Sequence, residues 1–209
     1  MSPMNNEIII SKYIKDPPDL MIDVGVGPKS EYMVLSKLYP SMKIIGFEPH
    51  PVRFAGLISK FNGVLMPYAI WDKNEKIKMY SSKQNAPKND APSCFPFDNR
   101  DKEVTVEARQ LDWVYDYIKE FKNILLWIDI EGAELKALEG ATIILNNIKY
   151  INIEVCEDPL YSGACTASEI HNFLSQLGFK NVNNYQFAVA YNGIKFHDAI
   201  YIRKNNVET

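Results

Sequence analysis

Cysteine is scarce in this sequence of 209 residues, and long apolar runs are missing from it. The three cysteines, Cys94, Cys156 and Cys165, are odd in number and lack C-x-x-C spacing, which argues against a disulfide framework and against a zinc site. Only a short apolar run follows Glu7 near the start, and no stretch is long enough to cross a bilayer. We therefore expect a soluble, unprocessed cytoplasmic protein with reduced thiols and no membrane partner.

A dominant charge of one sign is also absent. The 23 basic and 26 acidic residues give a net charge of −3, so the bulk electrostatics do not favour a nucleic acid as partner. With 46% hydrophobic residues, the chain can bury one sizeable core and is short for two. We predict a single domain over residues 1–209, with a polar lead-in at residues 1–19.

Short apolar runs alternate with helical patterns along most of the chain. Thr166 and Glu169 have the spacing of a capping box at a helix start, and Asn192-Gly193 between two alternating stretches is a strong signal for a hairpin turn. We predict strands at 20–22, 43–47, 64–66, 77–80, 104–108, 124–128, 150–155, 185–191 and 194–203, and helices at 32–38, 54–61, from about 132, and at 166–177.

Strands separated by helices predict an α/β fold, with a mainly parallel sheet that carries helices on both faces and ends in an antiparallel pair. Ligands of such sheets bind beyond the carboxyl ends of the strands. The segment 81–100 contains three prolines and many polar residues. We interpret it as a long surface loop on the substrate side of the site.

Glycines follow the first predicted strand, and an acid follows the second. Gly25 and Gly27 after Asp23 let a ligand approach the backbone, and Glu48 can accept both hydroxyls of a ribose. A dinucleotide site would have a third glycine where Ser30 stands, so S-adenosylmethionine is favoured over NAD. A purely structural glycine turn is the alternative.

Several stretches resemble one enzyme family, the FkbM-type S-adenosylmethionine-dependent methyltransferases. The similarity runs approximately from Leu20 to Val155, and its most specific part is Ile-Asp-Ile-Glu-Gly-Ala-Glu at 128–134. It implies a Rossmann-like class I methyltransferase fold, with seven strands, a C-terminal antiparallel hairpin and hydroxyl groups of sugars or polyketide rings as acceptors. The other similar stretches are 23–27, 46–51, 111–112 and 138–141.

The resemblance also implies roles for individual residues around the cofactor. The methionine end would lie against Asp23, Gly25 and Gly27, with Ser30 or Glu31 taking part because the glycine turn is shorter than in many relatives. Glu48, followed by Pro49, would bind the ribose, Ala69 and Ile70 would flank the adenine, and Asp129 would face the methyl group.

Four acids and one histidine are the candidates for chemistry or for support of the site. Asp129 and Glu154 end neighbouring predicted strands, where they can share a proton, act as a base or hold a cation such as Mg²⁺; a simple hydrogen bond from Glu154 is the alternative. Glu131 and Glu134 are expected in the first turn of the next helix, where they complement its dipole. His197 is a further candidate base.

The sequence thus predicts an S-adenosylmethionine-dependent O-methyltransferase that acts on a hydroxyl of a sugar or glycan. Three alternatives remain open: methylation of another small molecule, methylation of RNA, which needs a basic face, and a catalytically silent cofactor-binding domain. An NAD-dependent oxidoreductase is disfavoured by the missing third glycine.

Overall fold

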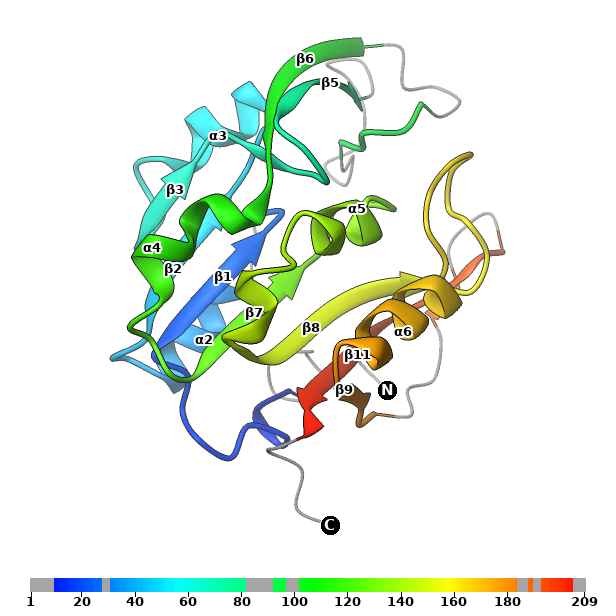
Figure 1. Cartoon of the computed structure of the whole chain (residues 1–209). Helices are drawn as coiled ribbons and strands as arrows, with labels where there is room; N and C mark the ends of the chain where they lie inside the picture. Colours follow the sequence, from blue (N-terminus) through cyan, green and yellow to red (C-terminus); the bar gives the residue numbers. More distant parts are fainter. Residues whose placement is uncertain are drawn as a thin grey trace.

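The computed structural model describes residues 10–27, 31–81, 92–96, 102–183, 188–189 and 193–204 (Figure 1). None of the helices formed by these residues combines the length and apolar character needed to span a membrane.

The main sheet follows the order β10-β11-β8-β7-β1-β2-β3, and β9 also pairs with β11. Strands β3, β2, β1, β7 and β8 are mutually parallel, whereas β11 runs antiparallel to β8, β9 and β10. The bounds are β1 (Leu20–Val24), β2 (Lys43–Phe47), β3 (Val64–Met66), β7 (Ile124–Ile128), β8 (Ile148–Cys156), β9 (Phe179–Asn181), β10 (Ala188–Val189) and β11 (Lys195–Arg203).

The predicted fold class is confirmed by this arrangement, including the antiparallel pair at the C-terminal end. Val189 of β10 pairs with Lys195 of β11 around the expected turn. Gly193 has a φ of 85°, the left-handed conformation that a hairpin turn requires, while its partner Asn192 lies outside the described residues.

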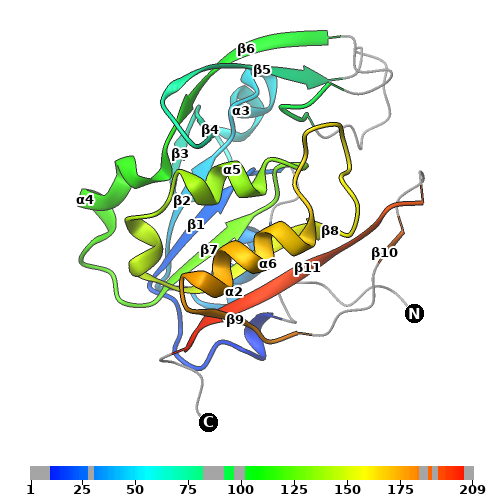
Figure 2. The same ribbon diagram turned by 45° about the vertical axis from the view of Figure 1, so that its right-hand side comes forward.

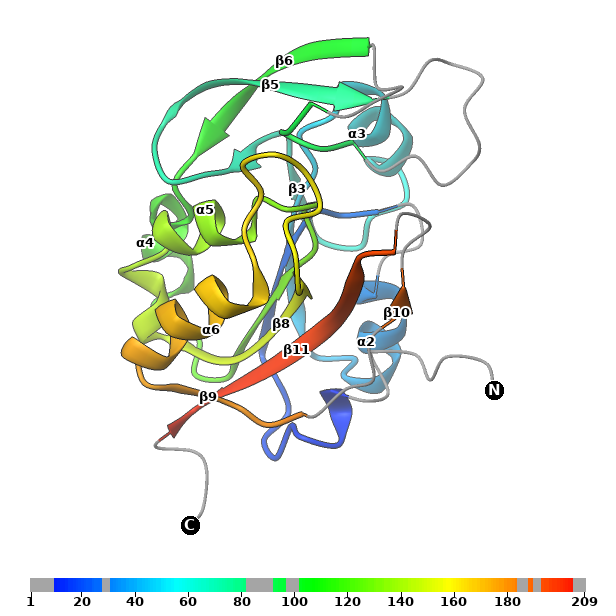
Figure 3. The same cartoon turned by 90° about the vertical axis from the view of Figure 1, so that its right-hand side faces the viewer.

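Helices cover both faces of the main sheet, as Figures 1 and 3 show. Side chains of α2 (Tyr32–Leu38) pack on one face, and those of α4 (Tyr115–Ile118), α5 (Glu134–Glu139) and α6 (Ala167–Gln176) pack on the other. The five residues of β7 are all buried because both faces are covered, which explains why this strand is a continuous apolar run.

The capping box of α6 forms as its sequence predicts. The Thr166 hydroxyl accepts a hydrogen bond from the Glu169 amide, and the Glu169 carboxylate accepts one from the Thr166 amide at 2.8 Å. Ile170 and Leu174 supply the buried face of the helix. Gly178, with a φ of 83°, lies just beyond its end.

The helix predicted at 54–61 is shorter than expected. It forms α3 (Pro51–Leu57), after which the chain tightens into a turn that leaves Ile58 exposed. After this turn, the centroid of the Phe61 ring lies 4.6 Å from that of the Tyr32 ring. The Phe61 ring also covers Gly46, where a β-carbon would lie only 2.5 Å from a ring carbon of Phe61. Packing of Phe61 across the glycine therefore overrides the helical periodicity of the sequence.

A second, three-stranded sheet has the order β4-β6-β5 and is formed by β4 (Ala69–Ile70), β5 (Glu75–Ser81) and β6 (Lys102–Arg109). It lies beyond α5, at the end of the main sheet where β1 and β7 terminate (Figure 2). Met79 of β5 and Val106 of β6 belong to a small hydrophobic core on one side of this sheet, and the other side carries exposed lysine–glutamate pairs that contribute little to stability.

Candidate active site

The site is built where the parallel strands of the main sheet end. The register pairs Val24 of β1 with Phe47 of β2 on one side and with Ile128 of β7 on the other. Ile128 in turn pairs with Ile153 of β8. The residues that follow these four positions therefore emerge side by side, and they are Gly25, Glu48, Asp129 and Glu154.

A cavity of about 680 Å³, counted with its opening to solvent, lies over these strand ends. The structure brings most of the predicted cofactor residues to its walls: Gly25, Gly27, Glu48, Pro49, Ala69, Ile70 and Asp129.

Gly25 forms the floor of the cavity and has no room for a side chain. Its φ is 100°, and a β-carbon would lie 2.0 Å from the carbonyl oxygen of Asp129. The amides of Gly25 and Val26 both donate to the Phe47 carbonyl at 3.0 Å, and the Asp129 amide donates to Val24 at 3.0 Å. The backbone thus forms an open cradle in which glycine is required for conformation and for space.

Glu48 is buried, yet it faces the cavity. Its Oε1 accepts a hydrogen bond from the His50 amide at 2.7 Å. Burial raises the pKa of Glu48 to about 7, while the His50 amide and the positive charge of Arg53 act in the opposite direction. Beside it, Phe47 and Ile70 provide apolar walls. A carboxylate next to apolar walls fits a ribose joined to a flat base.

We predict that nucleoside binding depends on pH through the raised pKa of Glu48. An ionised carboxylate can accept hydrogen bonds from both ribose hydroxyls, so with Glu48 as the ribose ligand we expect adenosine to bind about tenfold more tightly at pH 8 than at pH 6. Adenosine is the suitable probe because it lacks the titrating ammonium of the methionine moiety. Calorimetry across this pH range measures the effect, and Glu48→Gln should bind more weakly with a flat profile. A sloping profile in that variant would contradict the assignment.

Asp129 and Glu154 form a group of acids with their neighbours. Burial raises the pKa of Asp129 well above its usual value, and the negative charges of Glu154, Glu131, Asp198 and then Glu31 raise it further. The pKa of Glu154 is raised in the same way, first by burial and then by carboxylates. The two acids therefore retain protons at a pH where an exposed carboxyl group is ionised.

Asp129 is partly exposed and lines the cavity, whereas Glu154 is not part of the cavity wall. Glu154 pairs across the sheet with Asp198, whose Oδ1 accepts a hydrogen bond from Asn152 at 2.8 Å. Glu154 consequently acts on the site through its charge on Asp129.

Glu134 lies in the first turn of α5, as predicted, whereas Glu131 lies outside the helix. Glu134 begins α5 but is 3% exposed, and its Oε1 accepts hydrogen bonds from the amides of Ile130 and Gly132, both at 3.1 Å. The buried Glu134 carboxylate thus binds backbone amides just before the helix. Glu131 lies before the helix, in a turn, with a φ of 58°.

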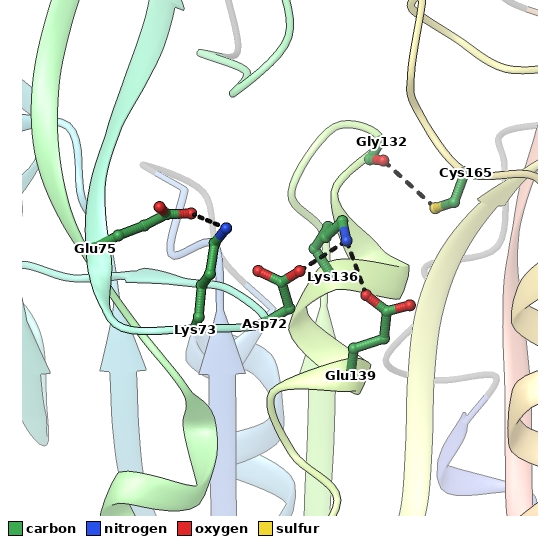
Figure 4. A network of polar contacts seen from close by, with 7 residues as sticks. All are labelled: Asp72, Lys73, Glu75, Gly132, Lys136, Glu139 and Cys165. Atoms are coloured by element: carbon green, nitrogen blue, oxygen red, sulfur yellow. Dashed lines mark hydrogen bonds and ion pairs between the residues drawn. The ribbon is translucent and has the colours of Figure 1, made fainter.

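This turn is fixed from two sides. The Gly132 carbonyl accepts hydrogen bonds from the amide of Cys165 at 3.1 Å and from its thiol at 3.4 Å (Figure 4). In the same view, the Lys136 ammonium donates to Asp72 at 2.8 Å and to Glu139 at 3.0 Å. The ion pair with Asp72 ties α5 to the segment after β4, and hence to the cavity wall.

Among the described residues, Asp23 and His197 were also predicted for the site but, like Glu154, do not line the cavity. Asp23 is 1% exposed and does not line the cavity. Burial raises the pKa of Tyr32, and the negative charge of Asp23 raises it further. His197 pairs with Val155, whose side chain belongs to the core under α5 and α6, so the strand alternation directs His197 away from the face that carries Glu154. Ser30 lies outside the described residues.

The cavity also has lining residues that the sequence patterns did not single out. Pro92 and Cys94 lie in the described part of the 81–100 segment, and Arg53 comes from the first turn of α3. Burial, followed by the charge of Glu134, raises the pKa of Cys94 to about 12, so its thiol is neutral. For Arg53, the available sequence signal was a positive charge five positions after Glu48. Further lining residues of this kind are Tyr68 and Met79.

Asp129 and Glu154 are the two acids for which the sequence allowed a bound cation. Among the residues that the structure describes, no group of three or more histidine, cysteine or acidic side chains is arranged to hold a metal ion.

The sequence matches known proteins at the level of family and fold. The family model described as "Methyltransferase FkbM domain" matches residues 23–180. The 2-O-methyltransferase NoeI of Sinorhizobium fredii (strain NBRC 101917 / NGR234) is 26% identical over 172 residues, which cover 74% of this chain and 70% of that protein.

Solved structures with the same fold are more distant in sequence. Magnesium protoporphyrin IX methyltransferase from Synechocystis PCC 6803, with bound SAM, superposes with a TM-score of 0.52 at 10% identity, over 95% of this chain and 76% of that chain. The plantazolicin methyltransferase BpumL, in complex with SAH, gives 0.50 at 13% identity, over 94% and 82%. Together with the family match over most of its length, the cavity at the strand ends identifies this chain as a member of the FkbM family of S-adenosylmethionine-dependent methyltransferases.

Proposed function

We propose that the protein transfers the methyl group of S-adenosylmethionine to a hydroxyl group of a sugar or glycan. One observation carries the proposal: a single cavity has Gly25 at its floor, Glu48 at the end of the strand on one side and Asp129 at the end of the strand on the other. The first two suit an adenosyl ligand, and the third suits an acceptor hydroxyl.

The residues around the cavity fit the cofactor part by part. Gly25 and Gly27 line the cavity and would hold the methionine moiety, with open space at Gly27, where nothing lies within 4 Å of a β-carbon position. Glu48 would accept the ribose hydroxyls, and the apolar surface of Ala69 and Ile70 would lie against the adenine. The bound cofactor supplies an electrophilic methyl group on a sulfonium.

The protein's task in such a reaction is to orient an acceptor hydroxyl and to receive its proton. Asp129 would do both, and its position in the cavity wall beside Gly25 supports this assignment. Its raised pKa, caused by burial and by Glu154, makes the ionised carboxylate a stronger proton acceptor than an exposed aspartate. Glu154 contributes through this charge and would not touch the acceptor.

The acceptor class has two lines of support. The relative NoeI is named a 2-O-methyltransferase, which favours a hydroxyl acceptor. The net charge of −3 and the carboxylates around Asp129 are unfavourable for the phosphates of RNA.

A screen of the purified protein against free sugars, glycans, other small hydroxyl compounds and RNA tests the proposal. Release of S-adenosylhomocysteine is the readout, with and without a chelator and added magnesium. We expect turnover with a sugar or glycan and loss of that turnover in Asp129→Asn. Turnover confined to RNA or to compounds other than sugars would refute the acceptor class. Cofactor binding without turnover of any acceptor would favour a catalytically silent domain.

A further inference from the structure

Glu131 has an unusual backbone for its residue type. Its φ of 58° makes it the one non-glycine residue with a positive φ in the part of the chain that the structure describes. Glycine adopts this conformation without strain, whereas a glutamate there is strained. The backbone conformation favours glycine at this position, yet the residue is a glutamate, which indicates a role for its carboxylate.

The side chain of Glu131 is at the site rather than in the helix that follows. Glu131 lines the same cavity as Asp129, two residues away along the chain. Its charge acts on both Asp129 and Glu154, which shows that the three carboxylates lie near one another.

Two contacts from distant segments hold Glu131 in this conformation. The Ser93 hydroxyl donates to its carbonyl oxygen at 2.9 Å, and the Tyr161 hydroxyl donates to its Oε2 at 3.3 Å. Ser93 is fully buried and is itself fixed by paired backbone hydrogen bonds to Tyr80. The carboxylate is therefore oriented before any acceptor binds, which is the condition for a specific contact.

We propose that Glu131 determines acceptor specificity by accepting a hydrogen bond from a second hydroxyl, adjacent to the one that Asp129 binds, so that the site selects vicinal diols. This inference rests on the proposed transfer to a hydroxyl group and names the acceptor class more narrowly. A carboxylate oxygen accepts hydrogen bonds, so Glu131 can accept one from a second hydroxyl next to the hydroxyl whose proton Asp129 receives. An acceptor with one hydroxyl would exclude water from Glu131 without making this second hydrogen bond, which is unfavourable.

The test compares matched acceptors on the wild type and on Glu131→Gly. One pair is a methyl hexoside and its monodeoxy analogues, each lacking one hydroxyl next to the methylated position, and the second pair is catechol and phenol. Glycine suits the backbone at this position, so the variant is expected to fold, and its melting temperature and affinity for S-adenosylhomocysteine provide the check. Glu131→Gln, which keeps the size but loses the charge, is the second variant.

The wild type is expected to prefer the diol by about 10- to 100-fold in kcat/KM, the range for a charged hydrogen bond. In Glu131→Gly the preference should fall below about threefold, with little change for the monodeoxy compound, and Glu131→Gln should be intermediate. A merely structural residue would change both acceptors equally.

The outcomes separate this inference from the proposed function. If the Glu131 variants lose the preference for the intact hexoside, the result supports the role of Glu131 and the sugar acceptor. If they lose a preference only for catechol over phenol, the result supports the role of Glu131 and refutes the sugar acceptor. Discrimination that survives in both variants, or a wild type without preference for the diol, overturns the role of Glu131 and leaves methyl transfer standing. A wild type that methylates none of these compounds overturns both.

Discussion

Asp129→Asn is expected to lower kcat by about two to four orders of magnitude, because asparagine keeps the shape of the side chain but cannot accept the proton of the acceptor hydroxyl. The affinity for S-adenosylhomocysteine should change by less than about threefold, since Gly25 and Glu48 are untouched. Single-turnover kinetics with the acceptor found in the screen and calorimetry with S-adenosylhomocysteine measure the two effects.

The same substitution should stabilise the protein at alkaline pH. Because the folded-state pKa of Asp129 is raised above its unfolded value, the folded state binds more protons than the unfolded state between these two pKa values. Stability is therefore lost as the pH rises through that window, and asparagine removes this loss. The melting temperature of Asp129→Asn should exceed that of the wild type at pH 8, by about 2–4 °C for each kcal/mol, and approach it near pH 4.

Glu107→Gln is the matched control for Asp129→Asn. It removes one carboxylate charge from the exposed side of β6, where Glu107 pairs with Lys76, so neither kcat nor the melting temperature should change measurably. An Asp129→Asn enzyme with wild-type kcat would exclude Asp129 as the proton acceptor. Loss of kcat in Glu154→Gln, with full activity in Asp129→Asn, would transfer the role to Glu154.

Gly25→Ala is expected to lose cofactor binding and to destabilise the fold. A β-carbon at Gly25 meets the Asp129 carbonyl oxygen at 2.0 Å, and the φ of 100° is unfavourable for alanine. This clash can be relieved only if β1 and β7 move apart at their carboxyl ends, beside Gly25 and Asp129. We expect a loss of about 2–4 kcal/mol in the free energy of unfolding and at least about a hundredfold in cofactor affinity, read by thermal unfolding and calorimetry.

Gly27→Ala provides the comparison within the same turn. Nothing lies within 4 Å of a β-carbon at Gly27, and its φ is not positive, so the stability should stay within about 0.5 kcal/mol of the wild type. Any loss of cofactor affinity in this variant then reports a direct clash with the ligand. If Gly25→Ala bound S-adenosylhomocysteine as tightly as Gly27→Ala does, the requirement for glycine at position 25 in cofactor binding would be refuted.

The main sheet could be predicted because its signals are local. The strand Lys43–Phe47 and the capped helix that begins after Thr166 both have the positions that the sequence predicts, since apolar runs and caps are set by neighbouring residues. The end of α3 could not be predicted in this way. Phe61 leaves the helical pattern to pack over Gly46, and that contact depends on how β2 lies in the folded sheet.

The site was predictable only where residues directly follow strands. Glu48 and Asp129 have such positions, and the structure brings both to the cavity. His197 was expected near them, yet the face on which it lies depends on the pairing of β11 with β8, which one sequence does not specify. Glu134 is the helix-start acid that the sequence predicts, but its burial depends on the turn whose amides it binds.

The position of β11 has a consequence for biosynthesis. Although it is the last strand in the sequence, it lies between β8 and β10, and its residues 196–202 pair with β8 along nearly its whole length. Until these residues leave the ribosome, β8 has an edge of unpaired amides and carbonyls next to the acids of the site. The sheet is therefore completed only after β11 has been synthesised, and a nascent chain that stalls before this strand exposes an unpaired strand edge to other chains or to chaperones.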